Sequence, residues 1–318
     1  MDDSLPSKTC LYVAAGRALG ARDPDPAVRN PDYLAERLLG PQERALVSEQ
    51  ACVRALDDAE MSKNMEALGS ALMMQVRTRF IEDRLAEEVA KGVRQVVILG
   101  AGFDTKAYRL TQLLKDARVF EVDRAATQEY KRRRIREAGI EVPTNLIYVP
   151  VDFRKDSLGA VLEKASYDPS KETFFIWEGV TMYLPETAVA ETLSWVARQA
   201  KGSTIIFDFI YQATLDFLAA LPNLENLPEQ AKQAIARVQK LEAGEPWVFG
   251  IPNGGEGEFL GRFGLQLRKL LPVGGEESRE RYLIRSDGSF YVPLPPGMTR
   301  PPVGAAANPS YCLLEAGV

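Results

Sequence analysis

Short apolar runs alternate with helix-like segments through the middle of the chain. The runs that predict strands lie at 95–99, 118–122, 146–150, 173–177 and 203–210. Their residues are mostly apolar rather than alternating, which is typical of parallel strands buried on both faces. Helical patterns separate the runs, notably at 127–138 and 185–200. Strands that alternate with helices predict βαβ units and an α/β, doubly wound parallel sheet.

Helical or irregular segments flank this alternating region on both sides. Helices are predicted at 7–20, 32–56, 61–91 and 211–241. The Gly- and Pro-rich segment 250–255 predicts a loop, and 293–309 is expected to be extended or mobile. Two further apolar runs, 265–273 and 311–315, predict closing strands and bring the sheet to seven. We expect the flanking helices to cap the sheet rather than form an independent domain.

The composition excludes several classes of site. The 318 residues contain no histidine, so a Ser-His-Asp triad, a Cys-His dyad and a histidine-containing zinc site are all excluded. The cysteines Cys10, Cys52 and Cys312 are far apart and odd in number, which predicts neither a disulfide framework nor a metal site. The start is acidic, and the apolar stretch 11–15 is too short for a signal core or a membrane span. We therefore expect a cytoplasmic protein that does not associate with membranes.

The charge balance argues against nucleic acid as a partner. The formal net charge is −5, and the one dense basic cluster is 131–134 together with Arg136. A nucleic-acid binder usually presents a basic patch or stripe. On a helix, such a run usually marks a solvated face, and we predict that for this cluster.

A glycine turn, Gly100-Ala101-Gly102, directly follows the first predicted strand. Ligands of open α/β sheets bind at the carboxyl ends of the strands, and glycines there let the backbone approach a ligand closely. A dinucleotide fingerprint would place a third glycine where Thr105 stands. The turn therefore fits a ligand without phosphates better than a pyrophosphate.

An acidic residue ends the second predicted strand. Asp123 stands 23 residues after Gly100, close to the spacing at which a carboxylate accepts hydrogen bonds from ribose hydroxyls. Such a ribose belongs to NAD and to S-adenosylmethionine (SAM) alike, and an exposed acid at a strand end is the alternative. Glu121 is the rival acid, and we expect it to point away from the Asp123 side.

Acids also follow the third and fourth predicted strands. Asp152, with Phe153 beside it, could meet an adenine ring, although an Asp that caps the next helix is the alternative. Glu178 is placed to meet a cationic ammonium group, and a solvated loop acid is the alternative. Tyr183 could face either the site or the core.

These residues together resemble the leucine carboxyl methyltransferase family of class I SAM-dependent methyltransferases, in its bacterial small-molecule O-methyltransferase branch. The resemblance runs from about Arg77 to Asp208, with fainter similarity before it and at 282–288. Its motifs are Arg77-Thr78-Arg79-Phe80 with Asp83, the run 95–105, Glu121-Val122-Asp123, Thr127-Gln128, Tyr130-Lys131, Val151-Asp152-Phe153 and Trp177-Glu178-Gly179 with Tyr183.

The resemblance implies a role for each matching residue in holding SAM. The residue at the Arg77 position pairs with the methionine carboxylate, a task suited to guanidinium. This role comes from the resemblance alone, and a surface helix arginine is the alternative. The turn from Gly100 through Ala101 to Gly102 passes under the methionine part and the ribose.

The strand-end acids are assigned in the same way. Asp123 takes the ribose hydroxyls, Asp152 with Phe153 meets the adenine, and Glu178 holds the methionine end near its ammonium. Tyr183 matches the family's tyrosine after that glutamate and borders the methyl acceptor, so we take it as the candidate catalytic residue.

The expected architecture is one α/β domain over 1–318, with a mostly parallel, seven-stranded Rossmann-like sheet and helical cap segments. We expect a helical N-terminal cap at 1–76, the SAM-binding core at 77–210, a helical cap insertion at 211–256, and closing strands with a tail at 257–318. The amino-terminal part is unlike that of the eukaryotic branch that methylates a protein phosphatase. This difference favours a small-molecule acceptor.

A carboxylate is the favoured acceptor. Methyl transfer from a sulfonium is an in-line displacement, and a carboxylate, with a pKa of about 4, is already ionised at neutral pH. A phenol, with a pKa of about 10, would usually need a general base, and no histidine is present to supply one. The alternatives are a non-catalytic SAM or nucleoside sensor and an NAD(P)-dependent oxidoreductase, whose third glycine and histidine acid are absent.

Overall fold

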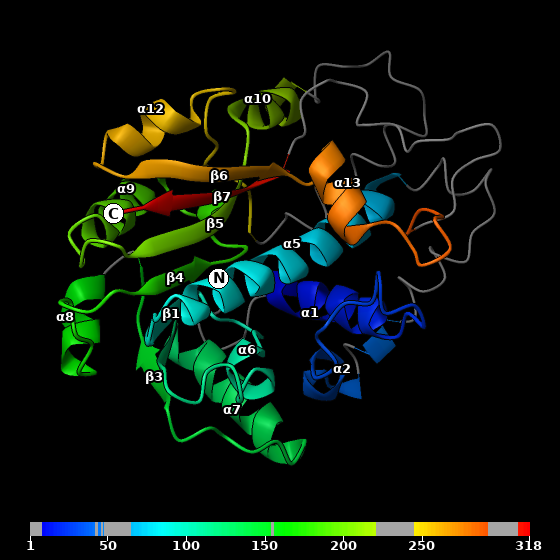
Figure 1. Ribbon diagram of the computed structural model, residues 1–318, viewed down its shortest axis with the longest axis horizontal. Helices are drawn as coiled ribbons and strands as arrows, with labels where there is room; N and C mark the ends of the chain where they lie inside the picture. The colour runs from blue at the N-terminus through cyan, green and yellow to red at the C-terminus, as the bar shows by residue number, and fades with distance from the viewer. Residues whose placement is uncertain are drawn as a thin grey trace.

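A seven-stranded sheet forms the centre of the protein (Figure 1). The computed structural model describes residues 8–41, 44–45, 47, 65–153, 156–220, 245–291 and 311–318. The strands are β1 (Gln95–Leu99), β2 (Arg118–Asp123), β3 (Leu146–Pro150), β4 (Phe174–Trp177), β5 (Thr204–Ile210), β6 (Gln266–Pro272) and β7 (Tyr311–Gly317). Each described strand begins and ends within two residues of its prediction.

The strand order β3-β2-β1-β4-β5-β7-β6 confirms the doubly wound topology. Strands β1 to β5 pair in parallel, whereas β7 lies antiparallel between β5 and β6. Strand order reverses between β1 and β4, which is where open α/β sheets bind ligands. Every residue of β1, β4 and β5 is buried, as their continuous apolar runs predicted.

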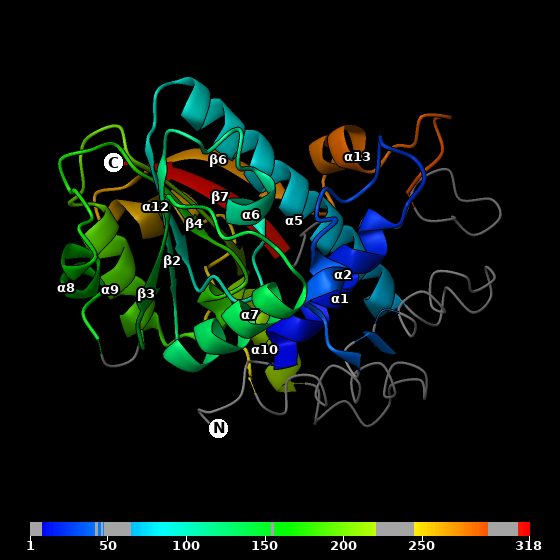
Figure 2. The same ribbon diagram turned by 90° about the horizontal axis from the view of Figure 1, so that it is seen from below.

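The two faces of the sheet bury separate hydrophobic clusters. Along β1, Val96 and Ile98 belong to one cluster, while Val97 and Leu99 belong to the other, as strand alternation requires. The first face is covered by α1 (Lys8–Ala21), α2 (Ala35–Leu38), α5 (Met65–Ala90), α6 (Lys106–Arg109), α7 (Ala125–Glu137) and α13 (Glu276–Tyr282). The second face is covered by α8 (Leu158–Lys164), α9 (Glu186–Val196) and α12 (Glu256–Gly261). Figure 2 shows α8 and α9 on the opposite side of the sheet from α5.

Several flanking predictions extend beyond the described residues. Of the helix expected at 32–56, the structure describes α2 and a few helical residues after it, and 48–64 lies outside the described residues. Of the helix expected at 211–241, it describes α10 (Gln212–Ala220), and the segment 293–309 lies wholly outside. The predicted loop at 250–255 is confirmed, with Ile251 forming an isolated bridge to Tyr211. Within these described ranges, every helix is too short or too polar to traverse a bilayer.

The basic cluster on α7 is only partly a solvated face, which corrects the prediction. Arg132, Arg133 and Arg136 are exposed, but the side chain of Lys131 is only 1% exposed. Its Nζ lies 2.8 Å from Oε2 of Glu121, which is equally buried in β2. Lys131 is therefore a core residue that compensates a buried carboxylate.

Candidate functional site

One cavity of about 340 Å³ lies at the carboxyl ends of the central strands. All nine residues predicted for the site line it: Arg77, Gly100, Ala101, Gly102, Asp123, Asp152, Phe153, Glu178 and Tyr183. They come from α5, from the end of β2, from the segments that follow β1, β3 and β4, and from the short 3₁₀ helix η1 (Thr181–Tyr183). The structure thus brings together residues from six separate parts of the chain.

The glycine turn after β1 has no room for a side chain at Gly100 and an unusual backbone conformation at both glycines. Gly100 has a φ of +64°, and a Cβ built on it would lie 2.4 Å from Cγ2 of Val180. Gly102 also has a positive φ, +41°, which side-chain-bearing residues rarely adopt. The backbone N–H of Ala101 donates to the carbonyl of Val122 at 3.1 Å and ties the turn to β2. At Gly100 and Gly102, the turn thereby presents bare backbone to the cavity.

Asp123 is oriented by backbone amides at the end of β2. Its carboxylate accepts hydrogen bonds from the N–H of Gly102 and, at 2.6 Å, from that of Arg124. Burial raises the pKa of Asp123, and these two N–H groups oppose the rise. A carboxylate has about four acceptor positions, so capacity remains for two further donors from the cavity.

The expectation that Glu121 points away from Asp123 was wrong. Residues two apart on a strand share a face, and the ammonium of Lys131 acts on both carboxyls. What separates the two acids is position along the strand. Glu121 lies deeper, is completely buried and does not line the cavity, and it pairs with Lys131 instead.

Asp152 and Phe153 are half-buried in the cavity wall after β3. The alternative reading of Asp152 as a helix cap is wrong, because Ser157 caps α8 by accepting from the N–H of Ala160. The backbone of Asp152 is instead held by Asp156, whose carboxylate accepts its N–H at 2.8 Å.

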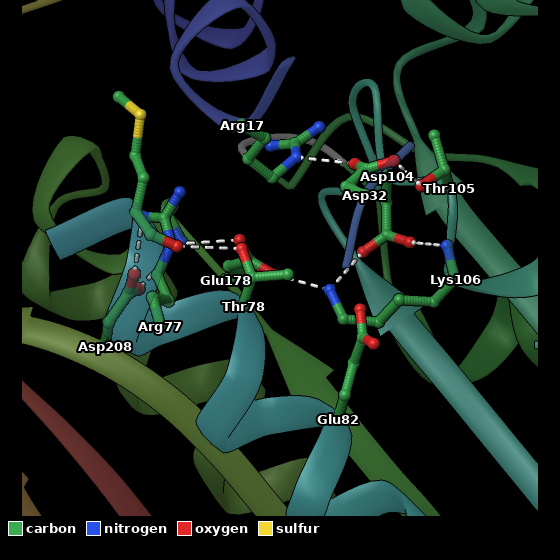
Figure 3. A network of polar contacts seen from close by, with 12 residues as sticks. Arg17, Asp32, Arg77, Thr78, Glu82, Asp104, Thr105, Lys106, Glu178 and Asp208 are labelled. Carbon is green, nitrogen blue, oxygen red and sulfur yellow. Dashed lines mark hydrogen bonds and ion pairs between the residues drawn. The ribbon is translucent and has the colours of Figure 1, made fainter. Parts of the chain in front are cut away.

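Glu178 and Arg77 form a buried ion pair at the other end of the cavity (Figure 3). Nε of Arg77 lies 2.9 Å from Oε1 of Glu178, and the two side chains are 3% and 9% exposed. The alternatives of a surface arginine and a solvated loop acid are therefore both wrong. Burial is the largest influence on the pKa of Glu178 and would raise it, but Lys106 and Arg77 together hold it well below its ordinary value.

The far side of Arg77 contacts two residues that sequence reasoning missed. Its Nη1 donates to Oδ2 of Asp208 at 2.9 Å and to the hydroxyl of Tyr311 at 2.7 Å. Tyr311 in turn donates to Asp208, and burial raises its pKa well above the ordinary value, so its hydroxyl stays protonated. Asp208 was detectable in principle, because it is a lone charge within the apolar run of β5.

Arg17 is a third missed residue, and it joins helix α1 to the glycine turn. It lines the cavity from α1, where Nη2 donates to the carbonyl of Phe103 at 2.8 Å. Its Nε lies 2.8 Å from Asp32, which also accepts a hydrogen bond from Thr105. Thr105, at the position of the missing third glycine, therefore ties the turn to Asp32 (Figure 3).

Tyr183 lies on the side of the cavity that is lined by η1 and the segment 245–248. The pKa of its hydroxyl is raised by burial, and the indole N–H of Trp247 partly opposes this by donating to it. The segment carrying Trp247 is fixed to η1, because the N–H of Val248 donates to the carbonyl of Met182 at 2.7 Å. Apolar and aromatic side chains thus dominate this wall: Val13, Met73, Met182, Leu184, Trp247 and Val248.

The leucine carboxyl methyltransferase family model matches residues 10–197 of the chain. A protein of Frankia alni is 37% identical over 61% of this chain and 65% of its own length. One of Mycolicibacterium smegmatis is 35% identical over 62% of this chain and 64% of its own length. Both are named "Putative S-adenosyl-L-methionine-dependent methyltransferase". In each case, the matched part is just under two thirds of the relative.

Two solved structures share the fold at low sequence identity. A protein titled "putative methyltransferase" from Thermobifida fusca is 15% identical with a TM-score of 0.52, over 99% of this chain and 96% of its own. A DUF574 family protein from Streptomyces avermitilis is 13% identical with a TM-score of 0.52, over 90% and 95%. These similarities show a shared Rossmann-like fold.

Proposed function

The chain belongs to the leucine carboxyl methyltransferase family, and from this premise we propose that it is a SAM-dependent O-methyltransferase. We propose that its acceptor is a small molecule with a carboxylate or, as a second choice, a hydroxyl group. The observation that supports this best is the convergence of backbone turn, strand-end acids and the Arg77–Glu178 pair on one cavity.

The nucleoside half of the cavity suits an adenosine without phosphates. Asp123, held by two backbone amides, presents its remaining acceptor capacity where ribose hydroxyls would donate. Phe153 offers a ring face to adenine, and Asp152 offers an acceptor for its amino group. The bare backbone of Gly100 and Gly102 lets the sugar approach closely.

The opposite end of the cavity carries both signs of charge, as a zwitterionic amino acid requires. Glu178 is ionised and would meet the ammonium of the methionine part. Arg77 would meet its carboxylate while remaining anchored by Asp208 and Tyr311. Arg17 of α1 also lines the cavity and, together with Arg77 and Lys106, lowers the pKa of Glu178.

Catalysis would come mainly from alignment. Bound SAM supplies a methyl group activated by its sulfonium. The protein's task is to hold an acceptor oxygen in line with that methyl, and good orientation alone can contribute about 7–11 kcal/mol. Tyr183 keeps its proton at neutral pH, so it would orient the acceptor by donating a hydrogen bond rather than act as a base.

The helical segments on either side of the core would build the acceptor pocket. Residues of α1 and the segment 245–248 line the cavity opposite the strand ends. We propose that 1–76 and 211–256 act as cap segments of a single domain over 1–318. The apolar character of this wall suits an acceptor whose body is apolar and whose reacting group alone is polar.

A label-transfer assay tests the proposal. Purified protein is incubated with methyl-labelled SAM and matched sets of carboxylic acids and phenols, and the label in extracted product is counted before and after mild base. Base-labile label indicates a methyl ester and base-stable label an ether, and either supports O-methylation. A protein that binds SAM but transfers no label to any acceptor would instead be the non-catalytic sensor.

A further inference from the structure

Lys106 is a buried cation behind the wall of the cavity. It begins α6, its side chain is only 4% exposed, and it does not line the cavity itself. Its Nζ lies 2.7 Å from Oε2 of Glu178 and 2.8 Å from Oδ2 of Asp104. Its backbone N–H donates to the other oxygen of Asp104 at 2.6 Å. Figure 3 shows this amine between the two carboxylates.

We infer that Lys106 is a positioning residue for the amino-acid end of SAM. It holds the Glu178 carboxylate ionised and turned toward the cavity, ready for the ligand's ammonium. The inference rests on the proposed function, because it assigns Glu178 that partner.

The contacts of Glu178 support this positioning role for Lys106. Lys106 donates a hydrogen bond to Oε2 at 2.7 Å, whereas Nε of Arg77 lies 2.9 Å from Oε1 without hydrogen-bond geometry, so Lys106 orients the carboxylate more directly than Arg77 does. Each oxygen keeps a second lone pair that can accept a hydrogen bond from an ammonium. Because Lys106 lies outside the cavity lining, it can hold Glu178 without competing for the ligand's place.

Arg77 alone is poorly suited to keep Glu178 ionised. Its charge is shared with Asp208, which is completely buried and also raises the pKa of Tyr183 and Tyr311. The charged and titratable groups that surround the Lys106–Glu178 pair are Arg17 on α1, Arg77 and Glu82 on α5, Asp104 in the turn, Asp208 on β5 and Tyr311 on β7. Of the cations, Lys106 opposes the effect of burial on Glu178 most strongly.

Two ligands separate this role from a general effect on folding. S-adenosylhomocysteine carries the amino-acid end, and 5′-methylthioadenosine lacks it but keeps the nucleoside. Titration calorimetry with both ligands on wild type, Lys106→Met and Lys106→Arg gives the dissociation constants. At about pH 6, we expect Lys106→Met to weaken S-adenosylhomocysteine binding about tenfold or more, because a neutralised Glu178 loses its ionic partner. Binding of 5′-methylthioadenosine should be unchanged, and Lys106→Arg should restore most of the loss.

The pH dependence of S-adenosylhomocysteine binding provides a second test, because the direction of the change is predicted. Without Lys106 the pKa of Glu178 rises, so binding in Lys106→Met should strengthen as the pH is raised from about 6 to 8, whereas wild type stays nearly flat. In a Glu178→Gln background, adding Lys106→Met should change the dissociation constant little, because the group through which it acts is already neutral.

The inference is overturned if Lys106→Met leaves S-adenosylhomocysteine binding unchanged, if it weakens both ligands equally, or if its effect persists undiminished with Glu178→Gln. A flat pH profile in Lys106→Met also overturns it. If wild type binds neither ligand, the proposed function itself fails. If wild type binds S-adenosylhomocysteine more tightly than 5′-methylthioadenosine, that function stands and the variants decide on Lys106 alone.

Discussion

Replacing Asp123 by alanine should remove most of the affinity for the nucleoside. The carboxylate sits at the end of β2, where two backbone amides orient it and its free acceptor positions face the cavity. We expect Asp123→Ala to fold, because the methyl group of alanine fits the space and water can reach the two released N–H groups from the cavity.

The size of the effect follows from the hydrogen bonds lost. A hydrogen bond to a charged group contributes about 1.5–3 kcal/mol, and a ribose offers two hydroxyls. Burial raises the pKa of Asp123, which means that keeping its carboxylate ionised costs free energy. That cost is subtracted from the free energy that the two hydrogen bonds contribute to binding. We therefore expect a net loss of about 2–4 kcal/mol, which is about 30- to 700-fold in the dissociation constant.

Isothermal titration with SAM measures this directly. Asp123→Asn, which keeps one acceptor oxygen but no charge, should lie between alanine and wild type. Asp116→Ala removes an exposed acid elsewhere and serves as the charge-matched control, with wild-type affinity expected. An Asp123→Ala variant that binds SAM as tightly as Asp116→Ala would refute the ribose assignment.

Three other substitutions test separate parts of the account. Gly100→Ala should weaken SAM binding and lower the free energy of unfolding by about 1–3 kcal/mol, because its methyl group would clash with Val180. Gly92→Ala, also at positive φ but with open space around it, should leave SAM binding intact, and equal losses of binding in the two variants would contradict the close-approach argument. Lys131→Met should lower the free energy of unfolding by about 3–5 kcal/mol, as expected when one partner of a buried pair is removed, and adding Glu121→Gln should recover part of it in denaturant titrations. In wild type, burial raises the pKa of Glu121 to about 7, so the native state keeps a proton that the unfolded chain releases near pH 4.5. The contribution of Glu121 to the free energy of unfolding should therefore fall as the pH rises between those values, and a contribution that grows over this range would contradict the raised pKa. Tyr183→Phe should leave the SAM dissociation constant unchanged and raise KM for the acceptor, and a loss of SAM affinity instead would move Tyr183 into the donor half.

The sheet was predictable because its strands are buried on both faces. A run such as Thr204–Ile210 is apolar at nearly every position, which a surface strand would not be, and the glycines and acids that follow these runs mark their carboxyl ends. Parallel strands place those ends together, so the sequence alone assigns Gly100, Asp123 and Glu178 to one edge of the sheet.

The charged network was less predictable because its members are paired across long separations in sequence. Lys131 looked like part of a solvated run, and only the fold shows that Glu121, ten positions earlier, faces it inside the core. Arg77 and Tyr311 are 234 residues apart, and no local pattern links them. The same holds for Arg17, whose place in the apolar face of α1 gave no sign of its contact with the glycine turn.

The central claim is that this cavity holds SAM, and a crystal structure with S-adenosylhomocysteine bound tests it most directly. We expect the ribose hydroxyls to donate to Asp123, the adenine to lie against Phe153, and the ammonium to face Glu178. A ligand bound outside this cavity, or one bound within it with its ribose away from Asp123, would contradict the account.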